Sequence, residues 1–222
     1  MIADIVSWIF LPVIYPMELV FNLLWGVTGS AGGSIILLAL IISILTIPLK
    51  RKARQAEDKF FALKRQVDAD VKEKAAGLKG ERRFEVIEKV YEGHSYHPIK
   101  SIIAGASFVV VLPFLISAIF IFGDADFLKQ VSFLFVRDLS VQDGLLFGLN
   151  FLPILMLVLG IGEAVLRWRG QREQLFRYLI ISIILFVLVY PLASGLITYW
   201  ISMNFWTAMI FYFANRQVPQ KT

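Results

Sequence analysis

Long apolar runs alternate with short polar segments along most of this sequence. Five of the runs predict membrane-spanning helices, at about 34–49, 101–122, 150–166, 176–189 and 194–214. The first run covers only about 24 Å at the helical rise. A basic cluster at its end, Lys50–Arg54, can snorkel to the interface and cover the mismatch. The pattern therefore predicts an all-α polytopic membrane protein with five transmembrane helices.

Residues 1–33 are apolar, but polar residues and prolines interrupt them at Asp4, Pro12, Pro16, Glu18 and Asn22. We expect a peripheral helix from about residue 17 to residue 27, lying on the outer leaflet with aromatic residues at interfacial depth. A turn of small residues follows at 28–33. The alternative is a sixth span, which would place residue 1 on the opposite side of the membrane.

The segment 51–95 is charged and amphipathic. Two apolar stripes at helical spacing flank Gly77 and Gly80; the first is Phe60, Leu63, Val67 and Val71, and the second is Phe84, Ile87 and Tyr91. This pattern predicts a cytoplasmic helical hairpin whose stripes pack on each other. Its basic face suits anionic lipid headgroups. Contact with ribosomal RNA or an incoming chain is the alternative, and no sequence-specific binding of nucleic acid is expected.

Several polar side chains interrupt the predicted spans. Such groups in hydrocarbon are costly unless they meet partners or water. They are therefore candidates for the lining of a hydrophilic groove: Ser43, Thr46, Ser107, Ser117, Glu163, Ser182, Thr198, Ser202 and Asn204. For each hydroxyl the alternative is a hydrogen bond between helices or back to a carbonyl of its own helix. For Glu163 the alternative is an ion pair with Arg167, four residues later.

Composition agrees with a membrane protein. Of the 222 residues, 58% are hydrophobic, there is no cysteine, and there are only two histidines. A disulfide framework is therefore impossible, and neither a metal site nor a cofactor is expected. No histidine lies near a nucleophile within a span, and no Gly-rich loop follows a strand. We therefore expect a protein that is not an enzyme.

The distribution of basic residues predicts the orientation. The first 49 residues carry no Lys or Arg, whereas fourteen of the 22 lie in the segment 50–100. A second cluster lies at 167–177, and the segment 123–150 has two basic residues against four aspartates. The positive-inside rule then places 50–100, 167–177 and the C-terminus in the cytoplasm and 123–150 outside. With five spans, the N-terminus is outside.

The last predicted span carries a pattern of prolines, small residues and aromatics that resembles a known family. Pro191, Gly195, Leu196, Tyr199, Trp200 and Asn204 resemble the last span of the YidC family of membrane protein insertases. Other segments match in order: Pro48 with Leu49, Pro113 in the second span, Asp138-Leu139-Ser140 with Gln142-Asp143, and Pro153 in Leu152–Met156. The resemblance covers nearly the whole chain in its minimal five-span form. It implies a membrane core over 34–216, before a short tail at 217–222.

The resemblance implies a water-filled groove, open to the cytoplasm and to lipid, that receives polar parts of an inserting chain. Ser43 stands where the family often has an arginine, and Val111 where it often has a glutamine. The implied function is insertion and folding of membrane proteins without an energy source of its own. The implied partners are nascent membrane proteins, the ribosome and the Sec translocon, in a bacterial plasma (inner) membrane.

Two other functions stay open at this point. The missing arginine and glutamine favour a diverged, non-inserting scaffold for a membrane enzyme or transporter. A transporter of a small substrate is the third reading, and it is weakened by the lack of internal repeats and of paired ionisable groups in the spans.

Overall fold

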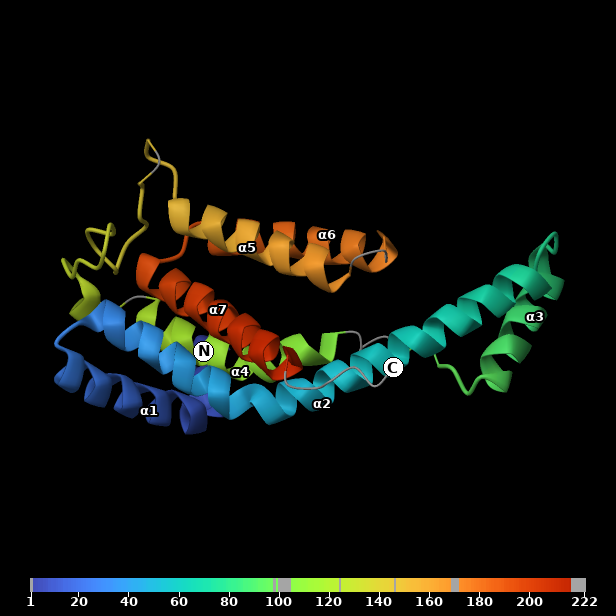
Figure 1. Cartoon of the computed structure of the whole chain (residues 1–222), viewed down its shortest axis with the longest axis horizontal. Helices are drawn as coiled ribbons and strands as arrows, with labels where there is room; N and C mark the ends of the chain where they lie inside the picture. Colours follow the sequence, from blue (N-terminus) through green and yellow to red (C-terminus); the bar gives the residue numbers. More distant parts are fainter. Residues whose placement is uncertain are drawn as a thin grey trace. The chain divides into compact units, whose positions relative to one another are not determined.

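Every regular element in the described part of the chain is helical, apart from one isolated bridge between Phe133 and Val136 (Figure 1). The computed structural model describes residues 2–97, 99, 105–123, 125–145, 147–168 and 172–216. Contacts divide the chain into two compact units, Met1–Leu45 with Pro113–Thr222 and Thr46–Leu112. The all-α class predicted from the sequence is confirmed.

The helices match the apolar runs of the sequence. They are α1 (Ile2–Thr28), α2 (Ala31–Lys74), α3 (Gly80–Gly93), α4 (Ala106–Phe122), α5 (Phe151–Arg167), α6 (Arg172–Val189) and α7 (Ser194–Arg216), with a 3₁₀ turn, η2 (Asp126–Leu128). Each of the five predicted spans falls on one of α2, α4, α5, α6 and α7. Residues 101–104, where the second span was expected to begin, and the tail 217–222 lie outside the described residues.

Two of these helices are long and apolar enough, among the described residues, to cross a membrane by length and composition. They are Trp8–Thr28 in α1 and Ala31–Lys74, which is α2. Shorter apolar helices lie at Ala106–Phe122, Phe151–Val165 and Gln174–Val189. At 23 residues α7 has the length of a span, but its polar residues lower its hydropathy.

Three prolines lie inside helices that they were expected to interrupt or end. α1 continues through Pro12 and Pro16, so the interruption predicted there is wrong. α2 continues through Pro48 into the charged segment, so the expected first span and the first helix of the hairpin are one helix of 44 residues. A proline removes one backbone hydrogen bond and bends a helix, but long apolar helices tolerate it when packing holds the neighbouring turns. In α1 that packing comes from the buried residues Ile14, Met17 and Phe21.

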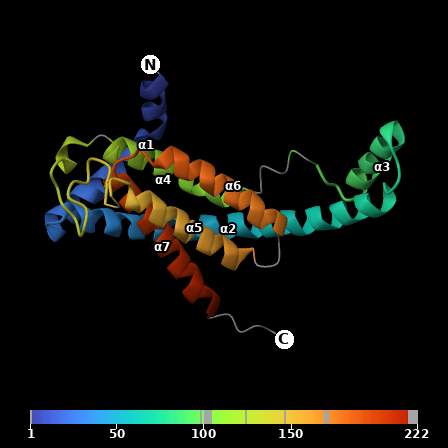
Figure 2. The same ribbon diagram turned by 90° about the horizontal axis from the view of Figure 1, so that it is seen from above.

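The core of the first unit joins α1, α4 and α7 through aromatic side chains. The ring of Phe21 meets that of Phe122 edge-on, with centroids 5.2 Å apart. The ring of Phe122 in turn lies 6.0 Å from that of Tyr199. Leu38 of α2 and Leu196 of α7 are also fully buried in this unit. α5 contacts both α6 and α7, and Figures 1 and 2 show α5 and α6 running side by side.

The segment between α4 and α5 covers the start of α7. The backbone carbonyl of Leu139 accepts a hydrogen bond from the Gly195 amide at 2.8 Å. The carbonyl of Val141 accepts bonds from the Ser194 amide at 2.8 Å and from the Ser194 hydroxyl at 2.6 Å. The first amides of a helix have no partner within the helix, and these carbonyls satisfy two of them.

The same segment also starts α5. Asp143 accepts hydrogen bonds from the amides of Phe151 at 2.6 Å and Leu152 at 2.9 Å, so its carboxylate caps the helix. The side chain of Asn150 donates to the carbonyl of Tyr190 at 2.9 Å. These bonds tie the start of α5 to the turn that follows α6.

The second unit contains the expected helical hairpin. α3 lies beside the last part of α2 (Figure 2), and the turn between them has positive φ at Gly77 and Gly80. Phe60 and Val67 of the first stripe are buried, as predicted. Phe84 of the second stripe is 66% exposed, so its expected packing on the partner helix is wrong. Val90 is the buried residue of α3 instead. The helix therefore packs on α2 with a different face from the one that the stripe predicted.

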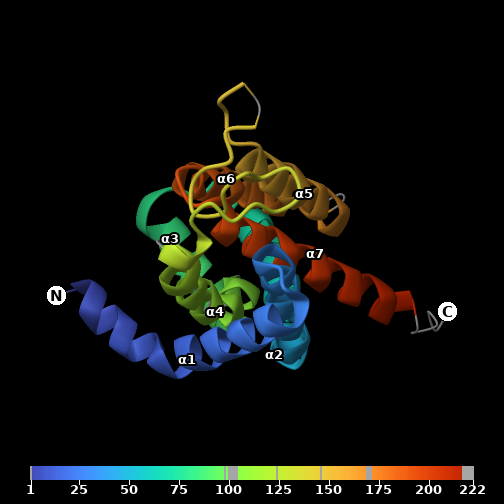
Figure 3. The same cartoon turned by 90° about the vertical axis from the view of Figure 1, so that its left-hand side faces the viewer.

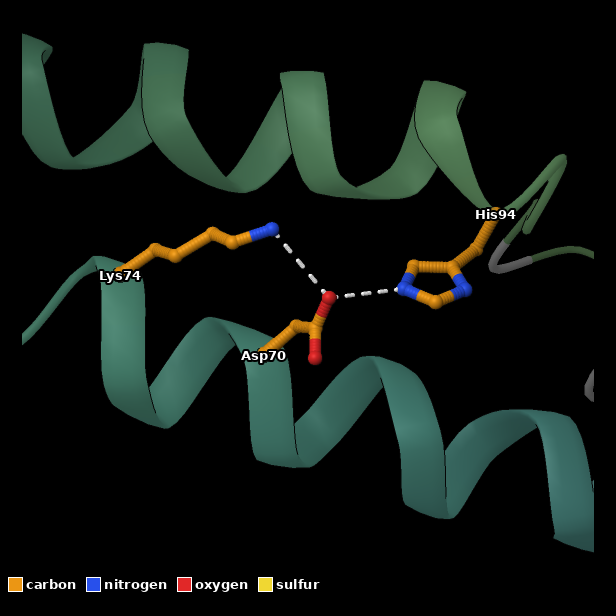
Figure 4. A network of polar contacts seen from close by, with 3 residues as sticks. All are labelled: Asp70, Lys74 and His94. Carbon is orange, nitrogen blue, oxygen red and sulfur yellow. Dashed lines mark hydrogen bonds and ion pairs between the residues drawn. The ribbon is translucent and has the colours of Figure 1, made fainter.

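A polar contact closes the hairpin near the end of α3. Asp70 accepts hydrogen bonds from His94 Nε2 at 2.9 Å and from Lys74 Nζ at 3.3 Å (Figure 4). The bond from His94 and then that from Lys74 hold the pKa of Asp70 below its ordinary value. The carboxylate therefore links the two helices of the hairpin over the whole physiological pH range.

Candidate functional site

The hydroxyls of α7 bond to the backbone of their own helix. Thr198 donates to the carbonyl of Ser194 at 2.7 Å, and Ser202 donates to that of Thr198 at 2.7 Å. On α4, Ser117 likewise donates to the carbonyl of Pro113 at 2.8 Å. A back-bonded hydroxyl shares a carbonyl that the helix already uses. These three hydroxyls thus make the back-bonds that the sequence offered as the alternative, and their place in a groove stays a prediction.

Ser43 joins two helices that are far apart in the sequence. Its hydroxyl donates to the carbonyl of Met203 on α7 at 3.3 Å, and its side chain is only 1% exposed. Ser43 thus makes a hydrogen bond between helices, as the sequence offered, and its place in a groove stays a prediction. The bond places Ser43, which stands where the family that the sequence resembles often has an arginine, against the backbone of α7.

Two buried donors on α7 lack a hydrogen-bond partner among the described residues. They are the hydroxyl of Tyr199 and the indole nitrogen Nε1 of Trp206. With Ser202 between them, they follow spacings of three and four, so they share one face of the helix; we call Tyr199, Ser202 and Trp206 the α7 face. A buried polar group without a partner costs about 1–3 kcal/mol. Groups of this kind in a membrane helix need an explanation, and a site for water or a polar ligand provides one.

A second group of polar residues lies in the other unit. Thr46 and Lys50 of α2 are buried, and Lys50 is only 4% exposed. Glu57 is also buried, and its carboxylate accepts the amide of Ser107, in the first turn of α4, at 2.7 Å. The Ser107 hydroxyl is buried without a hydrogen-bond partner in the part of the chain that the structure describes.

Sequence reasoning missed Lys50 and Glu57, because both were counted with the solvated basic segment. A signal was present. Ser43, Thr46, Lys50 and Glu57 follow one another at spacings of three, four and seven, which places them on one face of a continuous helix. The polar face of α2 therefore extends beyond the apolar run.

The remaining candidates are scattered over other helices. Glu163 on α5 and Ser182 on α6 are half-buried. Asn204 is exposed, although its neighbour Met203 is buried, so it lies off the α7 face. The side chain of Arg167 lies outside the described residues, and the predicted ion pair with Glu163 therefore stays a prediction.

A comparison with protein families decides where this arrangement belongs. A family model described as 60Kd inner membrane protein matches residues 23–221. The chain is a member of the 60Kd inner membrane protein (YidC) family. The resemblance inferred from the sequence is thereby confirmed.

Curated relatives and a solved structure agree with this assignment. The membrane protein insertase YidC of Prosthecochloris aestuarii is 29% identical over 63% of the chain, and that of Chloroherpeton thalassium 30% identical over 57%. The matched part is 25% and 21% of the length of these relatives. A crystal structure titled as an active YidC insertase with the first transmembrane domain resolved has a TM-score of 0.59 and 18% identity. It covers 93% of this chain and 46% of that one, and it supports the YidC fold.

The YidC motif residues outside the helices meet in one place. Asp138 accepts hydrogen bonds from the Ser140 amide and hydroxyl at 2.8 and 2.7 Å, which shape the turn before Val141. Desolvation raises the pKa of Asp138, but the bonds from Ser140 outweigh it and lower the pKa overall. The carbonyl of Pro191 accepts from the Gln142 side chain at 3.0 Å.

Close packing at Gly195 explains the glycine of the motif. An added Cβ would lie 3.0 Å from Cδ1 of Leu128 and 3.1 Å from the carbonyl oxygen of Leu139. Pro153 lies in the first turn of α5, where a missing amide leaves no bond unmade. Trp200 is half-buried beside the α7 face. The close approach at Gly195 thus packs the start of α7 against the segment between α4 and α5.

Proposed function

We propose that this chain inserts membrane proteins and assists their folding, and that the α7 face with Ser43 is where a client's polar groups are received. The proposal is carried by the two buried donors of α7 for which the described residues offer no partner. The membership of the YidC family, whose curated relatives are named membrane protein insertases, supports it.

The hydrogen bonds of the site suit a client segment that binds only for a short time. A client segment that crosses hydrocarbon loses its hydration, which costs several kcal/mol for each polar group. The hydroxyls of Thr198 and Ser202 can rotate from their carbonyls toward a guest at low cost, because each carbonyl keeps its helical amide. Tyr199 and Trp206 have no bond to a described residue that they would have to give up. Exchange of this kind lowers the barrier without a covalent step, so no energy source is required.

We propose the following arrangement in the membrane. α2, α4, α5, α6 and α7 cross it, with the N-terminus outside and the C-terminus in the cytoplasm of a bacterial cell. The hairpin of α2 and α3 lies in the cytoplasm, where its basic residues meet anionic lipids, the ribosome or the Sec translocon. α1 lies at the outer interface; its length also suits a sixth span.

Photocrosslinking at Trp206 tests the proposed site. Replacing Trp206 with the photoreactive residue p-benzoylphenylalanine keeps an aromatic side chain at the half-buried position. The neighbouring Phe205 is 49% exposed and serves as the matched, lipid-facing control. Ribosome-bound chains carrying a single transmembrane segment are offered to each variant in membranes.

We expect client crosslinks from position 206 and lipid adducts from position 205. If the folded, membrane-integrated protein gives no client crosslinks at 206, the proposed site is wrong. If in addition no client segment integrates in its presence, the insertase function fails and a scaffold role takes its place.

A further inference from the structure

The loop that precedes α5 presents apolar side chains that the described residues leave exposed. Phe147 is fully exposed, and its neighbours Leu145 and Leu149 are 37% and 55% exposed; we call these three residues the apolar tip. No charged residue occurs between Asp143 and Asn150. An uncharged surface loop of this composition is unusual in water, where exposed apolar groups usually mark a partner.

The base of the loop is fastened on both sides. Gly144 donates to the Asn150 side chain at 3.3 Å, and the Gly148 amide bonds back to the Gly144 carbonyl at 3.2 Å. The amide of Leu145 bonds to the Asp143 carboxylate at 3.1 Å, the same carboxylate that caps α5. The loop is thus a tied projection whose position is fixed by the first turn of α5.

The direction of the loop excludes a place inside the bundle. Figures 1 and 3, which are turned by 90° from each other, both show the yellow-to-gold loop before α5 extending away from α5 and α6. In the arrangement proposed above, where α5 and α6 cross the membrane, such a loop at the end of α5 meets lipid at the boundary of headgroups and acyl chains.

The lengths of the neighbouring helices point the same way. α5 has 17 residues and α6 has 18, which give roughly 26 and 27 Å at the helical rise. The hydrocarbon core of a bilayer is about 30 Å thick. Apolar residues beside the start of α5 would extend the short apolar band of this helix pair and reduce the mismatch.

We propose that the apolar tip inserts into the lipid interface at the N-terminal end of α5 and fixes the depth of α5 and α6 in the bilayer. The partner is the membrane surface and requires no particular headgroup, because the tip carries no charge. In the orientation proposed above, this is the outer leaflet. The inference concerns the anchoring of the chain and holds whether or not the chain inserts clients.

The absence of cysteine makes a direct test simple. Phe147→Cys and, as a matched control, Ser132→Cys are each spin-labelled in the full chain and reconstituted into phosphatidylcholine vesicles. Both positions are exposed, so neither change disturbs the core. Collision rates with lipid-soluble oxygen and with a water-soluble nickel chelate are then measured for each label.

We expect the ratio of oxygen to nickel collisions to be several-fold higher at position 147 than at position 132. Equal ratios, with both labels open to the nickel chelate, would overturn the proposal. An immobilised label at 147 that is shielded from both reagents would also overturn it, because that result indicates a protein contact.

Discussion

Asp143 is the residue whose loss should affect the fold most clearly. Its carboxylate accepts the part-buried amides of Phe151 and Leu152, and Asp143→Ala leaves both without an acceptor. Losing one N-cap acceptor costs about 1 kcal/mol, and a hydrogen bond to a charged group contributes about 1.5–3 kcal/mol. Since two amides of α5 share this carboxylate with the exposed amide of Leu145, we expect Asp143→Ala to lower the free energy of unfolding by about 2–4 kcal/mol.

The assay is equilibrium unfolding in mixed detergent–lipid micelles, followed by circular dichroism. Asp143→Asn keeps one acceptor oxygen, so it should lose about half as much. Asp126→Ala removes the same charge from the same segment, but the carboxylate of Asp126 is 89% exposed and pairs with the exposed side chain of Lys129. This control should unfold like the unaltered protein. An Asp143→Ala protein as stable as the unaltered chain, or an equal loss in the control, would refute the capping argument.

Three further predictions concern other parts of the chain. Tyr199→Phe removes a buried hydroxyl that lacks a partner among the described residues. The change should raise the free energy of unfolding by about 1 kcal/mol and slow client insertion in proteoliposomes. Unchanged stability would mean that water already satisfies the hydroxyl. Gly32→Ala places a methyl group against the base of the Phe133 ring and should destabilise the fold by about 1–3 kcal/mol in the same unfolding assay. The ionised carboxylate of Asp70 stabilises the hairpin fully above its ordinary pKa of 3.8, and this stabilisation is lost as pH falls through the lower pKa of the folded state. Spin-label distances between α2 and α3 should therefore lengthen in acid. In Asp70→Asn these distances should be long already at neutral pH.

The apolar runs predicted the helices well, because each helix between α4 and α7 consists mostly of one uninterrupted apolar run. The hairpin was also predictable, since Phe60 and Val67 follow helical spacing and glycines mark the turn. The prolines were less informative. Pro12 and Pro48 lie within continuous helices, because packing outweighs the loss of one hydrogen bond.

The meeting of distant segments could not be predicted from local patterns. Leu139 and Gly195 were noted separately as parts of motifs, yet their backbones are bonded to each other. Helical periodicity relates residues within one element only, so it says nothing about pairs separated by more than fifty positions. The burial of Lys50 could not be predicted for a related reason. A charged residue is expected to be exposed, and its burial depends on contacts with residues distant in the sequence.

The hydrogen bonds between the α4–α5 segment and α7 have a consequence for the order of synthesis. The carbonyls of Leu139 and Val141 bind the amides of Gly195 and Ser194, which are synthesised more than fifty residues later. Until α7 is made, those carbonyls lack the amides that bind them in the folded chain. α7 is therefore made after the segment that it binds, and this part of the fold stays incomplete until α7 has been synthesised.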